Sequence, residues 1–381
     1  MSSTRQDRLA LSLVVEPGDP RLRDLLLDLE PGAIVAAVRG RHARGQPRVP
    51  EAWSERGHDL DRTVETARAR AAAGGLRWLC PGDHGWPGAL SDLDHVEPLH
   101  GATGAPLGLW VRGKSNLAAL SQTSVAIVGA RECTTYGAEC ASELAIDCAD
   151  AGYTVISGAA YGVDGCAHRG AVMMGSPTVA VLACGADIDY PLSHGALLAR
   201  IAEDGLVVSE QAPGQRPMKG RFLSRNRLIA ALTQGTVVIE AASRSGSLNT
   251  LSWADQLGRT TMGLPGPVTS RQSTGVHAAL RGGKAVLVTS GKDVVEEMRG
   301  LGADSADEAP LLLTDFDRLP PTAQKALDGL DWSEPRSASE VAVVAHLSAR
   351  QVGPALALLE RRALASRIGS GWLLSRRADV G

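Results

Sequence analysis

The sequence predicts a Rossmann-like, doubly wound α/β fold, in which helices cover both faces of a mostly parallel β-sheet. Two observations support this prediction. Six short runs between residues 106 and 299 are apolar throughout, as strands buried on both faces of a parallel sheet are. Longer helical patterns separate them, for example at residues 136–151 and 247–257, and this alternation is typical of α/β layers. The six runs are residues 125–128, 154–156, 179–182, 206–208, 237–239 and 285–288.

With 381 residues, the chain is expected to contain more than one domain. Residues 1–75 combine leucines at helical spacing with Gly- and Pro-bearing loops, which predicts a small helical domain of the SAM or helix-hairpin-helix kind. This domain is either a DNA-binding module or a solvated helical bundle. Residues 76–300 are expected to form the extended Rossmann-like domain, and the acidic residues 301–312 a linker.

Residues 313–381 predict a winged-helix domain, because three helical patterns precede two short strands around a Gly turn. Pro320 and Pro321 open the first helix, residues 337–344 and 350–362 fit the next two, and residues 364–374 fit the hairpin. Basic and acidic residues are nearly balanced here, so a protein contact is as well supported as a DNA contact.

The composition, 44% hydrophobic and 21% charged, is that of an ordinary globular protein. Because the net charge is −3, any nucleic-acid binding has to come from a local basic patch. The six cysteines form no C-x-x-C pair and have no zinc-ligand spacing. We therefore expect buried, reduced thiols in a cytoplasmic protein with no metal, no cofactor and no membrane segment.

The first strand-to-helix turn, at Gly129 and Arg131, has the position of a dinucleotide-binding turn but not its G-x-G-x-x-G pattern. Arg131 stands where the second glycine would let the backbone approach a pyrophosphate. A guanidinium there suits a single phosphate at the mouth of a helix dipole, and the alternative is a structural ion pair within the loop.

Two further turns are rich in small residues. Ser157 and Gly158 follow the second strand of this domain, and Ser245, Gly246 and Ser247 open a helix after the strand at residues 237–239. Such turns let backbone amides face an anion at the carboxyl ends of the strands.

The strongest signal is the stretch from residue 215 to residue 227, which holds five cations and no acid around Phe222, one of two phenylalanines in the chain. Phosphates can meet the cations while a base stacks on the ring, a pattern suited to single-stranded DNA. The alternative is that Phe222 is a core anchor beneath a solvated basic face. The five cations are Arg216, Lys219, Arg221, Arg225 and Arg227. We expect this basic loop and the three turns to converge on one crevice.

In these residues the chain resembles the DprA/Smf family of DNA-processing proteins. The resemblance covers roughly residues 86–288 and rests on motifs that occur in order along the chain. They are Gly129-Ala-Arg131, Tyr136-Gly137, residues 157–164, Ala167-His168, Tyr190-Pro191, Ser209-Glu210, residues 222–230, residues 245–250 and Pro265-Gly266.

The resemblance implies single-stranded DNA binding, homodimerisation through the Rossmann-like domain, and loading of RecA recombinase during DNA recombination and natural transformation. It implies no catalytic residues. It places Arg131, Lys219 and Phe222 in the DNA pocket. The small-residue turns and the acid-free stretch supply the other candidate DNA-binding residues, which are Gly129, Ser157, Gly158, Arg225, Asn226, Arg227, Ser245, Gly246 and Ser247.

Two other functions stay open. Residues 232–240 keep the Gly-Thr…Glu spacing of nucleotide-cleaving phosphoribohydrolases of the LOG type but lack their Pro-Gly-Gly amide cradle, so Glu240 could be an acid/base remnant. Asp164 and His168 are a second acid/base candidate, or a capping and packing pair. The chain could also be an adaptor that works through its terminal domains.

Overall fold

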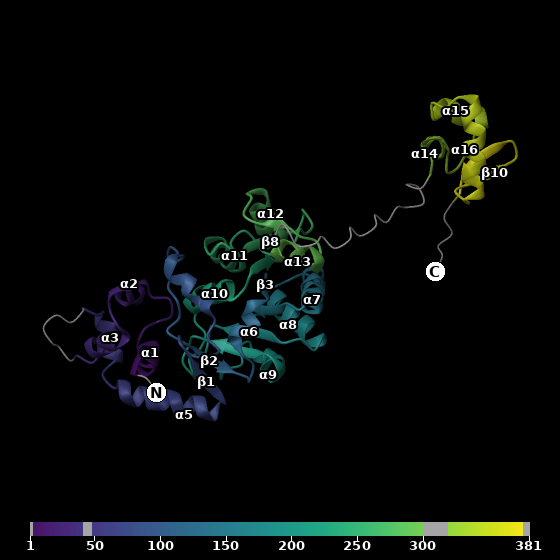
Figure 1. The fold of residues 1–381 in the computed structure, drawn as a ribbon. Coiled ribbons are helices and arrows are strands. Elements are labelled where there is room, and N and C mark those ends of the chain that lie inside the picture. Colours follow the sequence, from purple (N-terminus) through teal and green to yellow (C-terminus); the bar gives the residue numbers. More distant parts are fainter. Residues whose placement is uncertain (1–2, 41–47, 300–318, 376–381) are drawn as a thin grey trace. The chain divides into compact units, whose positions relative to one another are not determined.

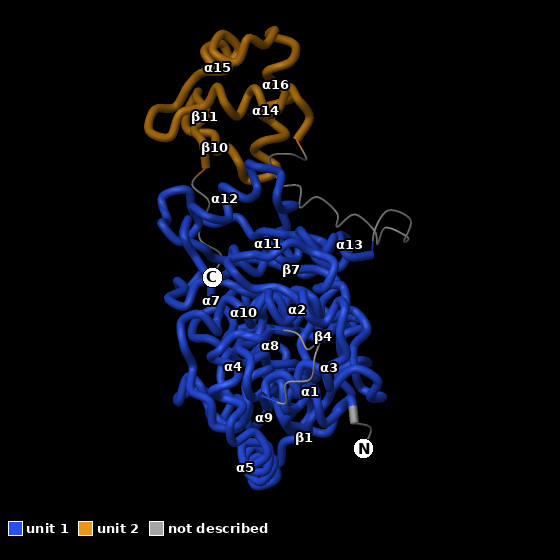
Figure 2. Tube along the Cα trace, turned by 90° about the vertical axis from the view of Figure 1, so that its left-hand side faces the viewer, with its two compact units in different colours: residues 1–304 blue, residues 305–381 orange. Residues whose placement is uncertain are grey.

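The computed structural model describes residues 3–40, 48–299 and 319–375. The chain forms two compact units, residues 1–304 and 305–381, which are treated separately (Figure 2). The predicted linker at residues 301–312 lies outside the described residues.

A nine-stranded sheet organises the first unit (Figure 1). Its order is β1-β2-β6-β5-β4-β3-β7-β8-β9, and every pair from β6 to β9 is parallel. This confirms the Rossmann-like prediction. The strands are β1 (Leu76–Leu79), β2 (Leu109–Arg112), β3 (Ser124–Val128), β4 (Thr154–Ser157), β5 (Thr178–Leu182), β6 (Leu206–Ser209), β7 (Gly235–Val238), β8 (Thr260–Gly263) and β9 (Val286–Leu287).

The order β5-β4-β3-β7-β8-β9 is the Rossmann strand order, with β6 added outside β5. The chain runs outward from β3 on one side and outward from β7 on the other. The point between β3 and β7 is therefore the topological switch point, where loops diverge and leave a crevice at the carboxyl ends of the strands.

Strand residues alternate between two buried layers. In β3, Val125 and Ile127 pack with α7 and α8, whereas Ala126 and Val128 pack with α10 and α11. This two-face burial explains why the runs are apolar throughout. The helices of this domain are α6 (Leu117–Gln122), α7 (Thr135–Asp150), α8 (Val163–Met173), α9 (Gly195–Asp204), α10 (Lys219–Ala231), α11 (Ser247–Gln256), α12 (Thr274–Arg281) and α13 (Gly291–Arg299), with 3₁₀ turns η1 (Gly88–His95), η2 (Leu192–His194) and η3 (Arg271–Ser273).

Three strands were not expected from the sequence. The β1 and β2 strands extend the sheet in antiparallel fashion, and Trp78 and Trp110 pack together with ring centroids 4.9 Å apart. The β8 strand, Thr-Thr-Met-Gly, is only partly buried and lacks an apolar run, so the hydrophobic pattern gave no signal for it.

The N-terminal helices have a core of their own that includes Leu11, Ile34 and Trp53. However, Leu9 of α1 and Ala67 of α5 join a cluster that contains sheet residues. These helices therefore belong to the first compact unit, and a domain boundary near residue 75 stays a prediction. They are α1 (Ser3–Val14), α2 (Pro20–Asp28), α3 (Pro31–Val38), α4 (Glu51–Arg56) and α5 (Leu60–Ala73).

The second unit contains three helices followed by a hairpin. Ser337 forms a capping box with Glu340 at the start of the second helix, and Val341 and Leu359 lie in the unit's core. This is the element order of a winged helix, whose assignment stays a prediction. The elements are α14 (Pro321–Asp328), α15 (Ala338–Val344), α16 (Ala349–Arg361), β10 (Ala365–Ile368) and β11 (Gly371–Leu374).

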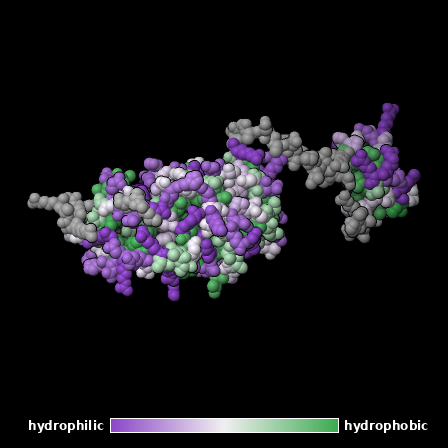
Figure 3. All heavy atoms as spheres, turned by 60° about the horizontal axis from the view of Figure 1, so that its bottom comes forward, coloured by the Kyte–Doolittle hydropathy of each residue, from purple (hydrophilic) through white to green (hydrophobic). Residues whose placement is uncertain are grey.

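The face drawn in Figure 3 is mostly hydrophilic, with hydrophobic residues scattered between polar ones. Within the described residues no single helix is long and apolar enough to cross a membrane. The helices α15 and α16 are long and apolar enough only when they are taken together, and a bend of 106° separates them.

Three cysteines, Cys80, Cys148 and Cys184, are buried, and the other three are partly exposed, so the expectation of buried thiols holds for half of them.

Candidate nucleic-acid interface

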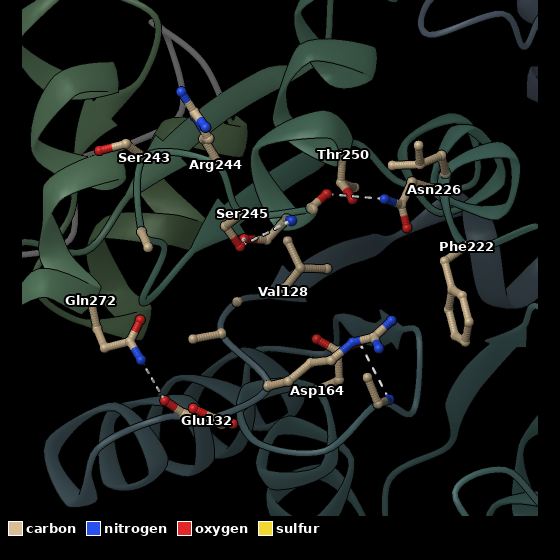
Figure 4. Close-up of a pocket in the computed structure, with 18 of the residues that line it drawn as sticks. Val128, Glu132, Asp164, Phe222, Asn226, Ser243, Arg244, Ser245, Thr250 and Gln272 are labelled. Atoms are coloured by element: carbon tan, nitrogen blue, oxygen red, sulfur yellow. Dashed lines mark hydrogen bonds between the residues drawn. The ribbon is translucent and has the colours of Figure 1, made fainter. Parts of the chain in front are cut away.

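A pocket with a cavity volume of about 1150 Å³ opens at the switch point between β3 and β7. Its walls come from the loop after β3, the first turn of α8, one side of α10 as far as Ile229, the loop before α11 with the first turn of that helix, and η3 (Figure 4). The structure brings nine of the predicted site residues together here: Gly129, Arg131, Lys219, Phe222, Arg225, Asn226, Ser245, Gly246 and Ser247.

The loop after β3 presents Arg131 to the pocket. Gly129 is required there because a Cβ atom would lie 2.6 Å from a methyl group of Val163 on α8. The exposed Arg131 side chain reaches across the pocket mouth, and its guanidinium carbon lies 4.4 Å from the centroid of the Phe222 ring. Arg131 therefore makes a cation–π contact with Phe222, and no ion pair links it to the described residues.

The acid-free stretch is largely a helix, α10, and not the expected loop. Lys219 and Phe222 lie in its first turn and face the pocket (Figure 4 for Phe222). The helix buries Arg221, Arg225 and Arg227, so the five cations do not form one exposed basic face. Of the five, only Lys219 and Arg225 line the pocket.

Arg227 was expected to bind DNA, but the structure places it in the core. Its side chain is fully buried and holds Glu210 through two parallel hydrogen bonds of 2.7 and 2.8 Å. Its Nε also donates to the carbonyl of Gly104 at 3.0 Å. Because every face of the guanidinium has a protein partner, Arg227 stabilises the fold and cannot reach a phosphate.

Arg225 is buried at the floor of the pocket. Its Nη1 donates to the carbonyl of Val181 at 2.7 Å, and Gly158 makes room for it, because a Cβ there would overlap the guanidinium. Burial lowers the pKa of Arg225. Burial also raises the pKa of the neighbouring Asp164, and the positive charge of Arg225 partly offsets this rise.

Ser157 and Gly158 were expected to offer amides to a ligand, and neither lines the pocket. The Ser157 hydroxyl donates to the carbonyl of Ile127 at 2.7 Å and ties β4 to β3. Gly158 serves the packing of Arg225. The small residues of this turn are therefore explained by close packing beneath the pocket.

The start of α11 forms the opposite wall. Gly246 occupies the N-cap position and has no side chain to cap this helix end, and the Ser247 amide makes only a long hydrogen bond of 3.4 Å to the Ser245 hydroxyl. The Ser245 and Ser247 hydroxyls lie 2.8 Å apart, and Asn226 of α10 donates to the Gly246 carbonyl at 3.0 Å. Asn226 thus fixes the position of a helix N-terminus that faces the pocket, where backbone amides and the helix dipole favour an anion.

The N-terminus of α7 is not available to a ligand, contrary to the expectation for Arg131. Glu240 accepts hydrogen bonds from the Thr134 amide at 2.8 Å and from the Thr134 hydroxyl at 2.7 Å. A Cβ at Gly137 would overlap the same carboxylate. Glu240 therefore takes the place of an external anion at this helix end, and Arg131 can contribute only its own charge.

Asp164 and His168 do not face each other as an acid/base pair. Asp164 accepts from the Ala160 amide at 3.5 Å, and His168 pairs through Nδ1 with the Thr178 hydroxyl at 2.8 Å. Burial lowers the pKa of His168 to about 3, so its imidazole is neutral. Capping and packing account for both residues.

Two pocket cations were not anticipated from the sequence. Arg244 and Arg271 are exposed and line the pocket, and neither forms an ion pair with the residues that the structure describes. Five cationic side chains thus line it against two acidic ones, Glu132 and Asp164. The only signal for Arg271 would have been its place after β8, a strand that the pattern did not reveal.

The fold and the pocket define a Rossmann-like protein with a mainly cationic pocket at its switch point. The family model for DNA recombination-mediator protein A matches residues 77–299. A DprA protein of Mycobacterium tuberculosis is 38% identical over 368 residues, which is 96% of this chain and 93% of the relative. The chain belongs to the DprA/Smf family.

Two solved structures are similar to the chain. The DNA processing protein A of Streptococcus pneumoniae has a TM-score of 0.62 and 30% identity over 78% of this chain and 98% of that one. The Helicobacter pylori protein, whose structure concerns its mode of binding single-stranded DNA, has a TM-score of 0.51 and 27% identity over 59% of this chain and 97% of that one.

Proposed function

We propose that this protein binds single-stranded DNA in the switch-point pocket. One observation carries the proposal: four exposed cations without ion pairs to described residues line the same pocket as the Phe222 ring and the N-terminus of α11. Cations and amides bind phosphates, while an aromatic ring offers a base a stacking partner. The four cations are Arg131, Lys219, Arg244 and Arg271.

A single strand fits this chemistry better than a duplex does. Phe222 can stack only on a base whose face is free, and paired bases in a duplex are already stacked on each other. The proposal further assigns the phosphate contacts to Arg131 and Lys219. Asn226, Ser245, Gly246 and Ser247 would form the amide-rich wall.

Fluorescence anisotropy with single- and double-stranded oligonucleotides of the same sequence, over a salt series, tests the proposal. We expect tighter binding of the single strand and a linear fall of log affinity with log salt, with a slope of about −0.7 for each phosphate that the protein neutralises. Equal affinity for both forms would contradict single-strand recognition.

Binding is better supported than nucleotide cleavage. The carboxylate of Glu240, which a phosphoribohydrolase would need, is buried and engaged by Thr134. It is not among the residues that line the pocket. Release of free base from a nucleoside monophosphate, abolished in a Glu240→Gln variant, would favour the enzyme instead.

The protein would then load RecA recombinase onto the bound strand, in the cytoplasm, during recombination and natural transformation. Membership of a recombination-mediator family supports this step. It can be measured as RecA filament formation on DNA that is coated with single-strand-binding protein. We expect faster filament growth with the wild-type chain than with Arg131→Ala, and equal rates would contradict loading.

Homodimerisation through the Rossmann-like domain is also proposed. The β9 strand lies at one end of the sheet, with Val286 and Leu287 respectively 44% and 54% exposed. Among the described residues its outer edge has no strand partner. Apolar edges of this kind pair with other chains. Sedimentation should show a dimer that Leu287→Lys dissociates, and a monomeric wild type would contradict the proposal.

A further inference from the structure

Three exposed side chains in two loops at the carboxyl ends of the strands are not among the residues that line the pocket. Tyr190, Leu192 and Tyr161 are respectively 37%, 85% and 52% exposed and belong to the loops after β5 and β4. Tyr153, in contrast, is buried with 7% exposure. Because an exposed aromatic cluster has a cost in water, its position beside a binding site calls for a ligand.

Tyr190 continues the pocket wall directly. Its ring centroid lies 5.7 Å from that of Phe222, and the two ring planes are tilted by 51°. Phe222 in turn carries the Arg131 guanidinium. The aromatic surface therefore passes without a gap from the pocket onto the loop after β5.

Tyr161 extends this surface. The Ser193 hydroxyl donates to the Tyr161 hydroxyl at 3.2 Å, and the Tyr161 ring meets His194 edge-to-face with centroids 5.3 Å apart. His194 is itself fixed, because its Nδ1 lies 3.1 Å from the Ala159 carbonyl. The segment 190–194 thus holds both tyrosines in place while their rings stay accessible.

We propose that Tyr190 and Tyr161 are two further base-stacking subsites, which extend the Phe222 pocket along the carboxyl edge of the sheet. Their ligand is the next nucleotides of the same single strand, so the inference rests on the proposed function. Continuity with the pocket identifies the occupant, since the first ring of the series contacts Phe222. Stacking is tolerant of sequence because every base has a π-face.

The test measures the affinity of the full chain for oligothymidylates of about 4 to about 16 nucleotides, the range of common single-strand site sizes. Tyr190→Leu and Tyr161→Leu keep an apolar side chain but remove the ring. Tyr190→Phe and Tyr161→Phe keep the ring. Leu192→Ala is the matched control, because it removes exposed apolar surface that cannot stack.

We expect each Leu variant to bind long oligonucleotides about 5- to 150-fold more weakly, which corresponds to one base–aromatic stacking interaction. For both Leu variants the weakening should grow with oligonucleotide length, because a strand must extend beyond the Phe222 pocket to reach either tyrosine ring. The Phe variants and Leu192→Ala should bind like wild type, and thermal unfolding should be unchanged for all five.

Wild-type affinity of both Leu variants at every length, while Arg131→Ala weakens binding, would overturn the two subsites and leave the proposed function standing. A weakening that is equal at all lengths, or that the Phe variants share, would also overturn them. If Arg131→Ala and the tyrosine variants all bind like wild type, the proposed function fails, and the inference fails with it.

Discussion

The guanidinium of Arg131 lies over the Phe222 ring, with its central carbon 4.4 Å from the ring centroid. One residue comes from the loop after β3 and the other from the first turn of α10. The side chain proposed to bind phosphate and the one proposed to stack on a base are therefore one physical unit. A ligand that displaces or covers Arg131 changes the surroundings of Phe222 as well.

Arg131→Ala should weaken single-strand binding for all sequences, because the variant lacks a guanidinium that is free of ion pairs at the pocket mouth. The slope of log affinity against log salt should flatten by about 0.7 for each phosphate that the variant no longer neutralises. Arg131→Lys is the control that retains the charge, and its slope should match wild type. An unchanged slope and affinity for the folded Ala variant would remove Arg131 from the interface.

Phe222→Ala should cost about 1–3 kcal/mol of single-strand affinity, because a base then has no ring to stack on. Because the ring is half-buried at the pocket and not in the core, the free energy of unfolding should fall by much less than the about 3–5 kcal/mol typical of a core phenylalanine. A double-mutant cycle with Arg131→Ala should show a coupling of about 0.5–1 kcal/mol in the free energy of unfolding, which is the size of an exposed cation–π contact. A large fall in stability with normal binding would make Phe222 a core residue.

Arg227 and Lys219, on the same helix, should behave in opposite ways. Arg227→Met leaves Glu210 buried without its partner and should lower the free energy of unfolding by about 3–5 kcal/mol. Lys219→Ala should leave stability unchanged and flatten the salt slope of DNA binding. Urea unfolding measures the stability role, and fluorescence anisotropy measures the DNA-binding role. An Arg227→Met variant that is as stable as wild type but binds DNA weakly would contradict the structural role of Arg227.

Removal of residues 305–381 should leave most single-strand affinity intact, since every residue that lines the pocket lies in the first unit. The nearly balanced charge of the second unit also gives it little electrostatic attraction for DNA. A fall of more than about tenfold, or about 1.4 kcal/mol, would make the second unit a principal DNA reader.

The buried His168 should make the fold sensitive to acid. Its pKa is about 3 in the folded chain against 6.5 in the unfolded chain, so below pH 6.5 only the unfolded chain takes up this proton. Stability should fall as pH drops from about 6.5 toward 3, by up to about 1.4 kcal/mol per pH unit. Asp164, whose pKa is raised in the folded chain, has the opposite effect on stability, because it favours the folded chain as the pH falls.

His168→Asn isolates the histidine contribution, since the other groups titrate in both proteins. Urea unfolding between pH 7 and pH 5 should show a weaker pH dependence for the variant than for wild type. The same dependence in both proteins would mean that His168 is protonated in the folded state.

The sheet was predictable because each strand of its parallel part, except β8 and β9, is a short, largely apolar run with two buried faces. The β9 strand was found from its apolar residues, although both are exposed and not buried as expected. Proximity of Arg131, Phe222 and Ser245 followed from the rule that parallel strands end at one edge. The direction of the α10 side chains did not follow. Basic residues predict exposure, but tertiary packing buries Arg225 and Arg227 by giving them carbonyl and carboxylate partners.

Residue type could not distinguish an anion site that is open from one that is occupied. The N-termini of α7 and α11 both follow small residues at a strand end, yet the Glu240 carboxylate fills the first, whereas the second has no carboxylate and only a 3.4 Å hydrogen bond to the Ser245 hydroxyl. This difference depends on a carboxylate at the end of β7 that is distant in sequence from Thr134. Long-range partners of this kind leave no local pattern.

Photo-crosslinking of a single strand that carries 5-iodouracil tests most directly whether bases of single-stranded DNA stack on Phe222 in the switch-point pocket, because it reports which residues touch the bases. The claim predicts crosslinks to Phe222, recovered after trypsin digestion in the peptide 222–225, and their disappearance in Phe222→Leu. Crosslinks confined to residues 319–375, with none in the first unit, would contradict it.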